Sequence, residues 1–190
     1  MNSLLVTYIL QTEKWTSPEL FETKNRIYTF LNPVSYLIAL ENKSLFEQFD
    51  GIFADGSLLV SAIRLVYGKR VTRRSFDMTS LAPELLNYLM ESRKTLYIVA
   101  SGQEQVECAV RIFQEQYPEL RIAGFRNGYF SSDAEMDMEA SHIVELNPDF
   151  LIVGMGALMQ EKFLLKVKRM GYQGIGFTCG GFIHQTAMNR

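Results

Sequence analysis

Short apolar runs alternate with longer amphipathic segments over most of this chain. Most positions in each run are apolar, and several runs end in turn residues such as Asn-Pro, Asp-Gly or Ser-Gly. This pattern is typical of strands that are buried on both faces of a parallel sheet. We therefore predict strands at residues 27–31, 51–54, 95–100, 121–125, 150–153 and 175–178.

The segments between these runs carry helix signals at their ends. Asn32 and Pro33 favour the N-cap and first position of a helix, Gly68 favours a C-cap, and Asp77 can cap a further helix. Helices are predicted at 33–49, 57–67, 77 to about 90, 103–117, 133–146 and 160–170. The apolar positions of the first two helices are Leu37, Leu40, Leu45 and Phe49, and then Leu58, Leu59, Ala62, Ile63 and Val66.

Strands and helices that alternate through short loops predict an α/β fold with a doubly wound, mostly parallel sheet. No repeat or linker divides the sequence, so we expect residues 1–190 to form a single domain. Ligands of such folds bind at the carboxyl ends of the strands. This rule selects the loops at 32–33, 55–56, 101–102, 154–160 and 178–185 as candidate binding segments.

The composition is that of an ordinary globular protein. With 190 residues, 47% apolar and 21% charged, the chain can bury one substantial core, and a net charge of −2 does not indicate nucleic-acid binding. Two cysteines without a Cys-x-x-Cys pair predict no disulfide framework and favour a reducing compartment. No apolar run is long enough to span a membrane, and residues 4–10 do not read as a signal peptide.

Asp55 directly follows a predicted strand and is followed by Gly56. A carboxylate at this edge of the sheet could take the proton of a substrate hydroxyl as a general base. Asp is also a good N-cap for a helix that begins at Ser57, and the position alone does not decide between these roles.

The segment from Gly154 to Gly156 lies between a predicted strand and a predicted helix, where backbone N–H groups favour a phosphate. A dinucleotide fingerprint would need a third glycine at position 159, which is Met159, and a pair of glycines is also common in tight turns. Gln160 and Glu161 follow, and their side chains could hydrogen-bond a sugar or a base.

Four cations, Lys69, Arg70, Arg73 and Arg74, stand within six residues. They could bind a diphosphate or a lipid phosphate, or they could simply form a solvated loop. Cys179 and His184 lack further ligands, so we expect no metal site there.

Several segments, in this order along residues 27–181, resemble the bacterial WecG/TagA/CpsF glycosyltransferase family. The Asp-Gly pair, the Gly-Tyr-Phe turn and the Gly-x-Gly loop before Gln-Glu are together fairly specific. The matching segments are Leu31-Asn32-Pro33, Phe53-Ala54-Asp55-Gly56, Arg74 to Asp77, Asn127-Gly128-Tyr129-Phe130, Asn147-Pro148-Asp149, and Gly154-Met155-Gly156 with Gln160-Glu161.

The resemblance implies a Rossmann-like fold and an inverting enzyme that moves a sugar, commonly N-acetylmannosamine or glucose, from a UDP donor to a lipid-linked acceptor. Such enzymes act at the inner face of the cytoplasmic membrane in teichoic acid, common antigen or capsule synthesis, without a metal or other cofactor. Asp55 would be the base, and Asn32 and Gln160 would line the substrate pocket. The UDP leaving group would be stabilised by amides near Gly156 and by Arg73 or Arg74.

Three positions depart from the family pattern. Leu158-Met159 replace Pro-Lys, Phe30 replaces a threonine, and Phe182-Ile183-His184-Gln185 stand where Phe-Asp is usual. Family members also continue into a basic, membrane-associating C-terminal segment, which we expect this chain to lack. Residues 162–190 carry basic but no acidic residues, and weak membrane binding is therefore expected.

Other interpretations remain open at this point. The chain could be a nucleotide-sugar-binding module without turnover, or an oxidoreductase, which the missing third glycine disfavours. The sequence leaves the donor sugar, the acceptor and a homo-oligomeric state undecided.

Overall fold

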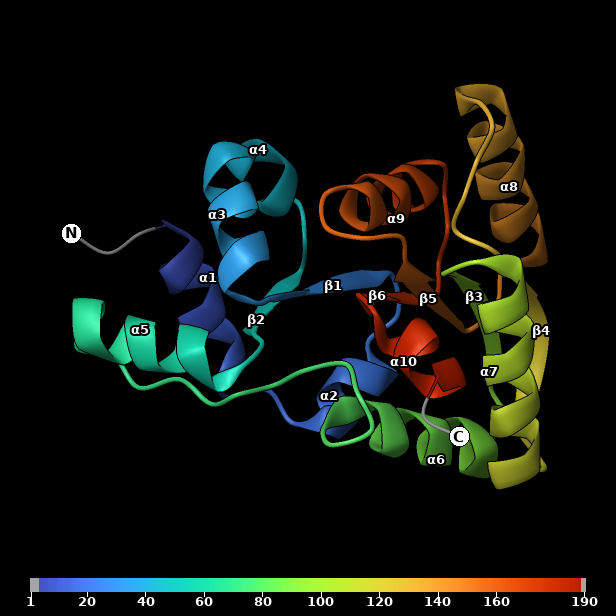
Figure 1. The fold of residues 1–190 in the computed structure, drawn as a ribbon, viewed down its shortest axis with the longest axis horizontal. Helices are drawn as coiled ribbons and strands as arrows, with labels where there is room; N and C mark the ends of the chain where they lie inside the picture. Colours follow the sequence, from blue (N-terminus) through green and yellow to red (C-terminus); the bar gives the residue numbers. More distant parts are fainter. Residues whose placement is uncertain (1–3, 189–190) are drawn as a thin grey trace.

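The computed structural model describes residues 4–188, which fold around one six-stranded sheet (Figure 1). Every pair of neighbouring strands is parallel, and the strand order is β2-β1-β6-β5-β3-β4. The strands are β1 (Arg26–Leu31), β2 (Gly51–Ala54), β3 (Thr95–Ala100), β4 (Arg121–Arg126), β5 (Phe150–Gly154) and β6 (Ile175–Thr178). The predicted doubly wound α/β fold is confirmed, and each predicted strand lies within one residue of its observed bounds.

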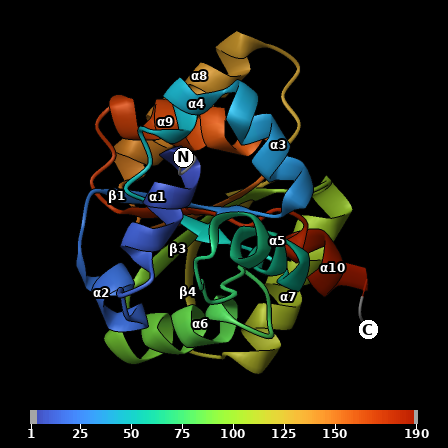
Figure 2. The ribbon, with the colours of Figure 1, turned by 90° about the vertical axis from the view of Figure 1, so that its left-hand side faces the viewer.

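Helices cover both faces of the sheet, and each face has its own apolar core. Figure 2 shows α3, α4, α8 and α9 on one side and α2 and α6 on the other. One core includes α2 (Ser17–Glu22), α6 (Leu81–Ser92), α7 (Gln103–Gln116) and α10 (Phe182–Met188). The other includes α1 (Leu4–Thr12), α3 (Pro33–Glu41), α4 (Lys43–Phe46), α5 (Ser57–Tyr67), α8 (Asp133–Leu146) and α9 (Met159–Arg169).

The predicted helix at 33–49 is wrong in its length. The structure ends α3 at Glu41, because Asn42 leaves the helical conformation and its side-chain amide donates to the Ile38 carbonyl at 2.9 Å. Asparagine competes for backbone groups in this way and often ends a helix. A separate short helix, α4, follows, and Leu37 is 62% exposed whereas Phe49 is buried.

The N-cap predicted at Asp77 is also wrong, since α6 begins at Leu81 after Ser80. The Asp77 carboxylate instead accepts hydrogen bonds from the Thr79 backbone N–H, the Thr79 hydroxyl and the Ser75 hydroxyl, at 2.6–2.8 Å. These bonds fold the segment before α6 into a compact turn. Asp77 is thereby held at the carboxyl edge of the sheet, beside the loop that follows β2.

Three helices, α1, α2 and α10, were not predicted. α1 packs against β2 with Leu5, Val6 and Ile9 fully buried. α10 packs against α7, where the rings of Phe182 and Phe113 are stacked with centroids 5.7 Å apart. Within residues 4–188, none of the helices is long and apolar enough to cross a membrane.

Candidate active site

A cavity of about 200 Å³ opens at the carboxyl ends of β1, β2 and β6. Asp55, Asn32 and Gln160 line it together, and they come from three of the loops selected because each follows a strand. Aromatic side chains, Phe30 and Phe76, form part of its wall. Carboxylate, amide and aromatic groups around one small cavity are suited to a ligand with several hydroxyl groups and an apolar ring face.

Asp55 lies at the carboxyl end of β2 and is not the N-cap of α5. The N-cap is Gly56, whose φ of +86° is a conformation that glycine adopts readily. The Asp55 backbone N–H donates to the Leu31 carbonyl at 2.8 Å, which fixes the residue at the end of the sheet. Burial raises the pKa of the Asp55 carboxyl, and the charge of Asp77 raises it further, whereas Arg73 and the Gly56 N–H oppose the rise.

Asp77 belongs to the candidate site, although the sequence indicated no role for it beyond a helix cap and the end of a segment that matches the family. It lines the same cavity as Asp55 and forms an ion pair with Arg73 at 2.7 Å. Burial opposes its ionisation, but hydrogen bonds from Thr79 and Ser75, together with the Arg73 charge, lower its pKa overall. The two carboxyls therefore differ in character, because Asp77 is held as a carboxylate while Asp55 is the more basic group.

The loop after β5 contributes to a second cavity of about 450 Å³ farther along the sheet edge. Gly156 is exposed, with a φ of +82°, and a Cβ atom there would have no other atom within 4 Å. Gly154 has a packing role instead, because a Cβ atom there would lie 2.7 Å from the Cys179 sulfur and from the Gly180 carbonyl. Both predicted glycines therefore line the cavity, but they do so for different reasons.

The same cavity contains two residues to which the sequence assigned no ligand contact, although His184 falls in the candidate binding segment 178–185. Tyr129, on the turn after β4, is 75% exposed at its rim, and His184 reaches it from α10. Asn32 lines this cavity as well as the one around Asp55, so the two are neighbours. The Asn32 side-chain oxygen also caps α3, accepting from the Val34 and Ser35 N–H groups at 3.0 and 2.9 Å.

Gln160 and Glu161 are adjacent in the sequence, but only the Gln160 side chain reaches the cavity. Gln160 reaches the cavity and accepts a hydrogen bond from the Gly180 N–H at 3.1 Å. Glu161 is fully buried behind it and accepts from Thr29, Gln160 and the Leu158 N–H at 2.7–2.9 Å. Burial raises the pKa of Glu161, while these donors oppose the rise. Its carboxyl orders the loop and the Gln160 side chain, and its place does not fit the substrate contact predicted for it.

The two predicted arginines also differ. Arg73 lies beside the cavity through its pair with Asp77. Arg74 lies over the Phe53 ring, 5.2 Å from its centroid, and its Nη1 is buried without a hydrogen-bond partner among the described residues. A cation over an aromatic face contributes to packing, so only Arg73 is well placed for a ligand in this cavity.

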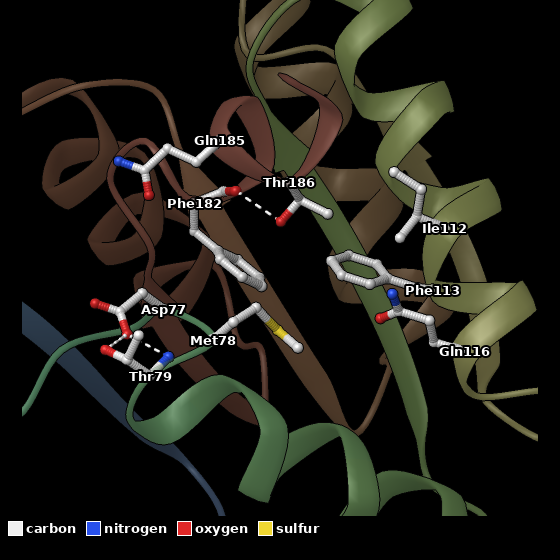
Figure 3. Close-up of a pocket in the computed structure, with 9 residues that line it drawn as sticks. All are labelled: Asp77, Met78, Thr79, Ile112, Phe113, Gln116, Phe182, Gln185 and Thr186. Atoms are coloured by element: carbon white, nitrogen blue, oxygen red, sulfur yellow. Dashed lines mark hydrogen bonds between the residues drawn. The ribbon is translucent and has the colours of Figure 1, made fainter. Parts of the chain in front are cut away.

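A third cavity, of about 360 Å³, adjoins the one around Asp55, and Figure 3 shows the residues that line it. Met78, Phe113 and Phe182 give it an apolar wall, and Asp77 and Gln185 stand at its rim. Asp77, Phe182 and Gln185 also line the cavity around Asp55. The three cavities thus adjoin one another, and Asp55 lines the middle one.

Cys179 is poorly suited to act as a nucleophile. Burial raises the pKa of its thiol, and a thiol must lose its proton to become nucleophilic. Over the described part of the chain, no three His, Cys, Asp or Glu side chains are grouped as they would be around a metal ion.

Comparisons with known proteins point to one enzyme family. A sequence model described as "Glycosyl transferase WecG/TagA/CpsF family" matches residues 10–189. The chain is 34% identical over 161 residues to a protein of Shigella boydii named UDP-Gal:alpha-D-GlcNAc-diphosphoundecaprenol beta-1,4-galactosyltransferase, covering 85% of this chain and 67% of that protein. It is 23% identical over 185 residues to a Bacillus subtilis protein named N-acetylglucosaminyldiphosphoundecaprenol N-acetyl-beta-D-mannosaminyltransferase, covering 95% and 69%.

Proposed function

This chain belongs to the WecG/TagA/CpsF glycosyltransferase family, and we propose that it moves a sugar from a UDP-sugar to a lipid-linked diphosphate acceptor with inversion at the anomeric carbon. The single observation that carries the mechanism is the position of Asp55. Its half-buried carboxyl, with a raised pKa, stands at the end of β2 among polar and aromatic side chains. A general base needs this combination of access to substrate and increased basicity.

In the proposed reaction the acceptor hydroxyl attacks the anomeric carbon from the side opposite the diphosphate. Asp55 takes the proton of that hydroxyl while the new C–O bond forms. The bond between the anomeric carbon and the donor phosphate breaks, and its electron pair leaves with UDP. One proton and one glycosyl group are transferred, so the step needs neither an oxidant nor a reductant.

The cavity beside the β5 loop suits the nucleotide. Backbone N–H groups near Gly156 precede α9, and the N-terminal end of a helix favours a phosphate group. His184 can donate a hydrogen bond to the same diphosphate, and Arg73 can add a positive charge from the neighbouring cavity. Tyr129 offers an exposed ring on which a base could stack.

The names of the relatives suggest the substrates. Both relatives are named for transfer to an N-acetylglucosaminyl-diphosphoundecaprenol, one of galactose and one of N-acetylmannosamine. We propose the same class of acceptor here, with galactose as the first donor sugar to test, ahead of N-acetylmannosamine and glucose. Such an acceptor would place the protein at the inner surface of the cytoplasmic membrane, as a peripheral protein.

The test is a transfer assay with UDP-galactose, UDP-N-acetylmannosamine and UDP-glucose against an N-acetylglucosaminyl-diphosphate carried on a short isoprenoid. A product larger by one hexose or N-acetylhexosamine, with inverted anomeric configuration, is expected. UDP binding without a product from any of the three donors would instead favour the non-catalytic nucleotide-sugar-binding module.

A further inference from the structure

An apolar surface covers the outer sides of α3 and α5, which we call the α3–α5 face. It comprises residues that are 62–87% exposed: Val34, Leu37, Leu58, Leu65 and Val66. A groove of about 300 Å³ runs between the two helices, and its lining, including Pro33 and Ala62, is almost entirely apolar. Exposed apolar side chains that gather in one patch mark an interaction site more often than scattered ones do.

The α5 helix is apolar on two sides. Leu59 and Ile63 face the core, whereas Leu58, Ala62, Leu65 and Val66 follow each other at helical spacing on the outer side. The sequence shows only that Leu58, Leu59, Ala62, Ile63 and Val66 are apolar, because a helix that is apolar on two sides does not reveal which side is covered. In Figure 2 α5 lies toward the viewer with α3 beside it, at one end of the molecule.

Positive charge borders this face. Residues 56–76 contain five basic residues and no acidic residue. Of these, Arg64 is exposed on α5, and Lys69 and Arg70 are exposed directly after its C-terminal end. Apolar side chains flanked by Lys and Arg are typical of surfaces that bind an anionic bilayer, because the chains enter the interface while the cations contact lipid phosphates.

The α3–α5 face is continuous with the candidate active site. Asn32 and Asp55 line the cavity, and Pro33, one residue after Asn32, and Leu58, three residues after Asp55, line the groove. Arg73 continues the basic segment to the ion pair with Asp77 at that cavity. A lipid surface held against α3 and α5 would therefore lie next to the space in which the acceptor reacts.

We propose that the α3–α5 face docks on an anionic phospholipid bilayer, so that the lipid-linked acceptor enters the active site from this side. The inference rests on the proposed function for the nature of the acceptor, but docking itself needs neither donor nor acceptor. The proposal also predicts stronger membrane binding than is expected from the dilute basic residues of 162–190 alone.

The test compares binding of the full chain and two variants to vesicles of phosphatidylglycerol and phosphatidylcholine. Leu65→Glu/Val66→Glu places two carboxylates on the proposed contact, at sites so exposed that the fold should tolerate them. The control is Met138→Glu, which changes a residue that is 66% exposed on α8, away from α5 (Figure 1). We expect the double variant to lose about tenfold or more in vesicle affinity, and the control to bind nearly as the unchanged chain does. Binding should be stronger with phosphatidylglycerol and weaken with salt.

Equal vesicle binding by the double variant and the control would overturn the proposal. So would a change from dimer to monomer in the double variant without loss of vesicle binding, since the face would then join two copies of this chain. Transfer to the short-isoprenoid acceptor in free solution separates the two proposals. The double variant should keep this activity, and its absence in the unchanged chain would count against the proposed function and leave the docking result standing.

Discussion

The carboxyl groups of Asp55 and Asp77 line the same cavity although they come from different loops, and the charge of Asp77 raises the pKa of Asp55. Burial contributes most to the raised pKa of Asp55, and the negative charge of Asp77 adds to it. Asp77 itself stays ionised through Thr79, Ser75 and Arg73. The pair therefore supplies one basic carboxyl, and the neighbour that increases its basicity is held in place by its own hydrogen bonds.

Replacing Asp77 with Asn should shift the pH dependence of transfer. Removing the negative charge lowers the pKa of Asp55, and Arg73, released from its ion pair, acts in the same direction. The acid limb of the kcat/KM profile reports the ionisation of the free enzyme's base, so its midpoint should move to lower pH. A matched control is Asp137→Asn, which removes an exposed carboxylate that pairs with Lys166 on the other side of the sheet. A midpoint that stays in place or rises would show that Asp77 does not act on the base.

Glu161→Ala should destabilise the protein and weaken donor binding together. The substitution leaves Thr29, Gln160 and the Leu158 N–H without their acceptor. Each buried donor left unpaired costs about 1–3 kcal/mol, which a urea titration of the free energy of unfolding would detect. Glu19→Ala is the comparison, since Glu19 has the same position in the first turn of α2 but bonds Thr16 at the surface. Equal losses in the two variants would mean that Glu161 is only a helix cap.

UDP should bind in the presence of a chelator. A metal ion in the site would need free carboxylate oxygens, but those of Asp77 already accept hydrogen bonds from Thr79 and Ser75 and pair with Arg73. The positive charge for the diphosphate would come from Arg73 and from backbone N–H groups near Gly156. Calorimetric titration of UDP with and without the chelator measures this directly. Binding that disappears with chelator and returns with magnesium or manganese would require a metal in the site.

The sequence was sufficient for the sheet, because apolar runs such as 95–100 leave little alternative to buried parallel strands. It also located Asp55, since a residue directly after β2 must lie at the carboxyl edge. The positions of the other site residues depend on contacts between segments that are far apart in the sequence. Nothing near Asp77 in the sequence indicates that it lines the same cavity as Asp55, and nothing near Glu161 indicates that Thr29, from β1, donates to it. Which side of an apolar helix such as α5 is buried likewise depends on the assembled fold and cannot be read from the sequence.

The most direct test of Asp55 as the general base is the transfer rate of Asp55→Asn, measured beside its affinity for UDP. Asparagine has nearly the same shape but does not take the proton, so the rate should fall about 10²–10⁴-fold while UDP binding and the unfolding midpoint stay unchanged. Transfer at the rate of the unchanged protein would contradict the assignment and leave Asp55 without a catalytic role.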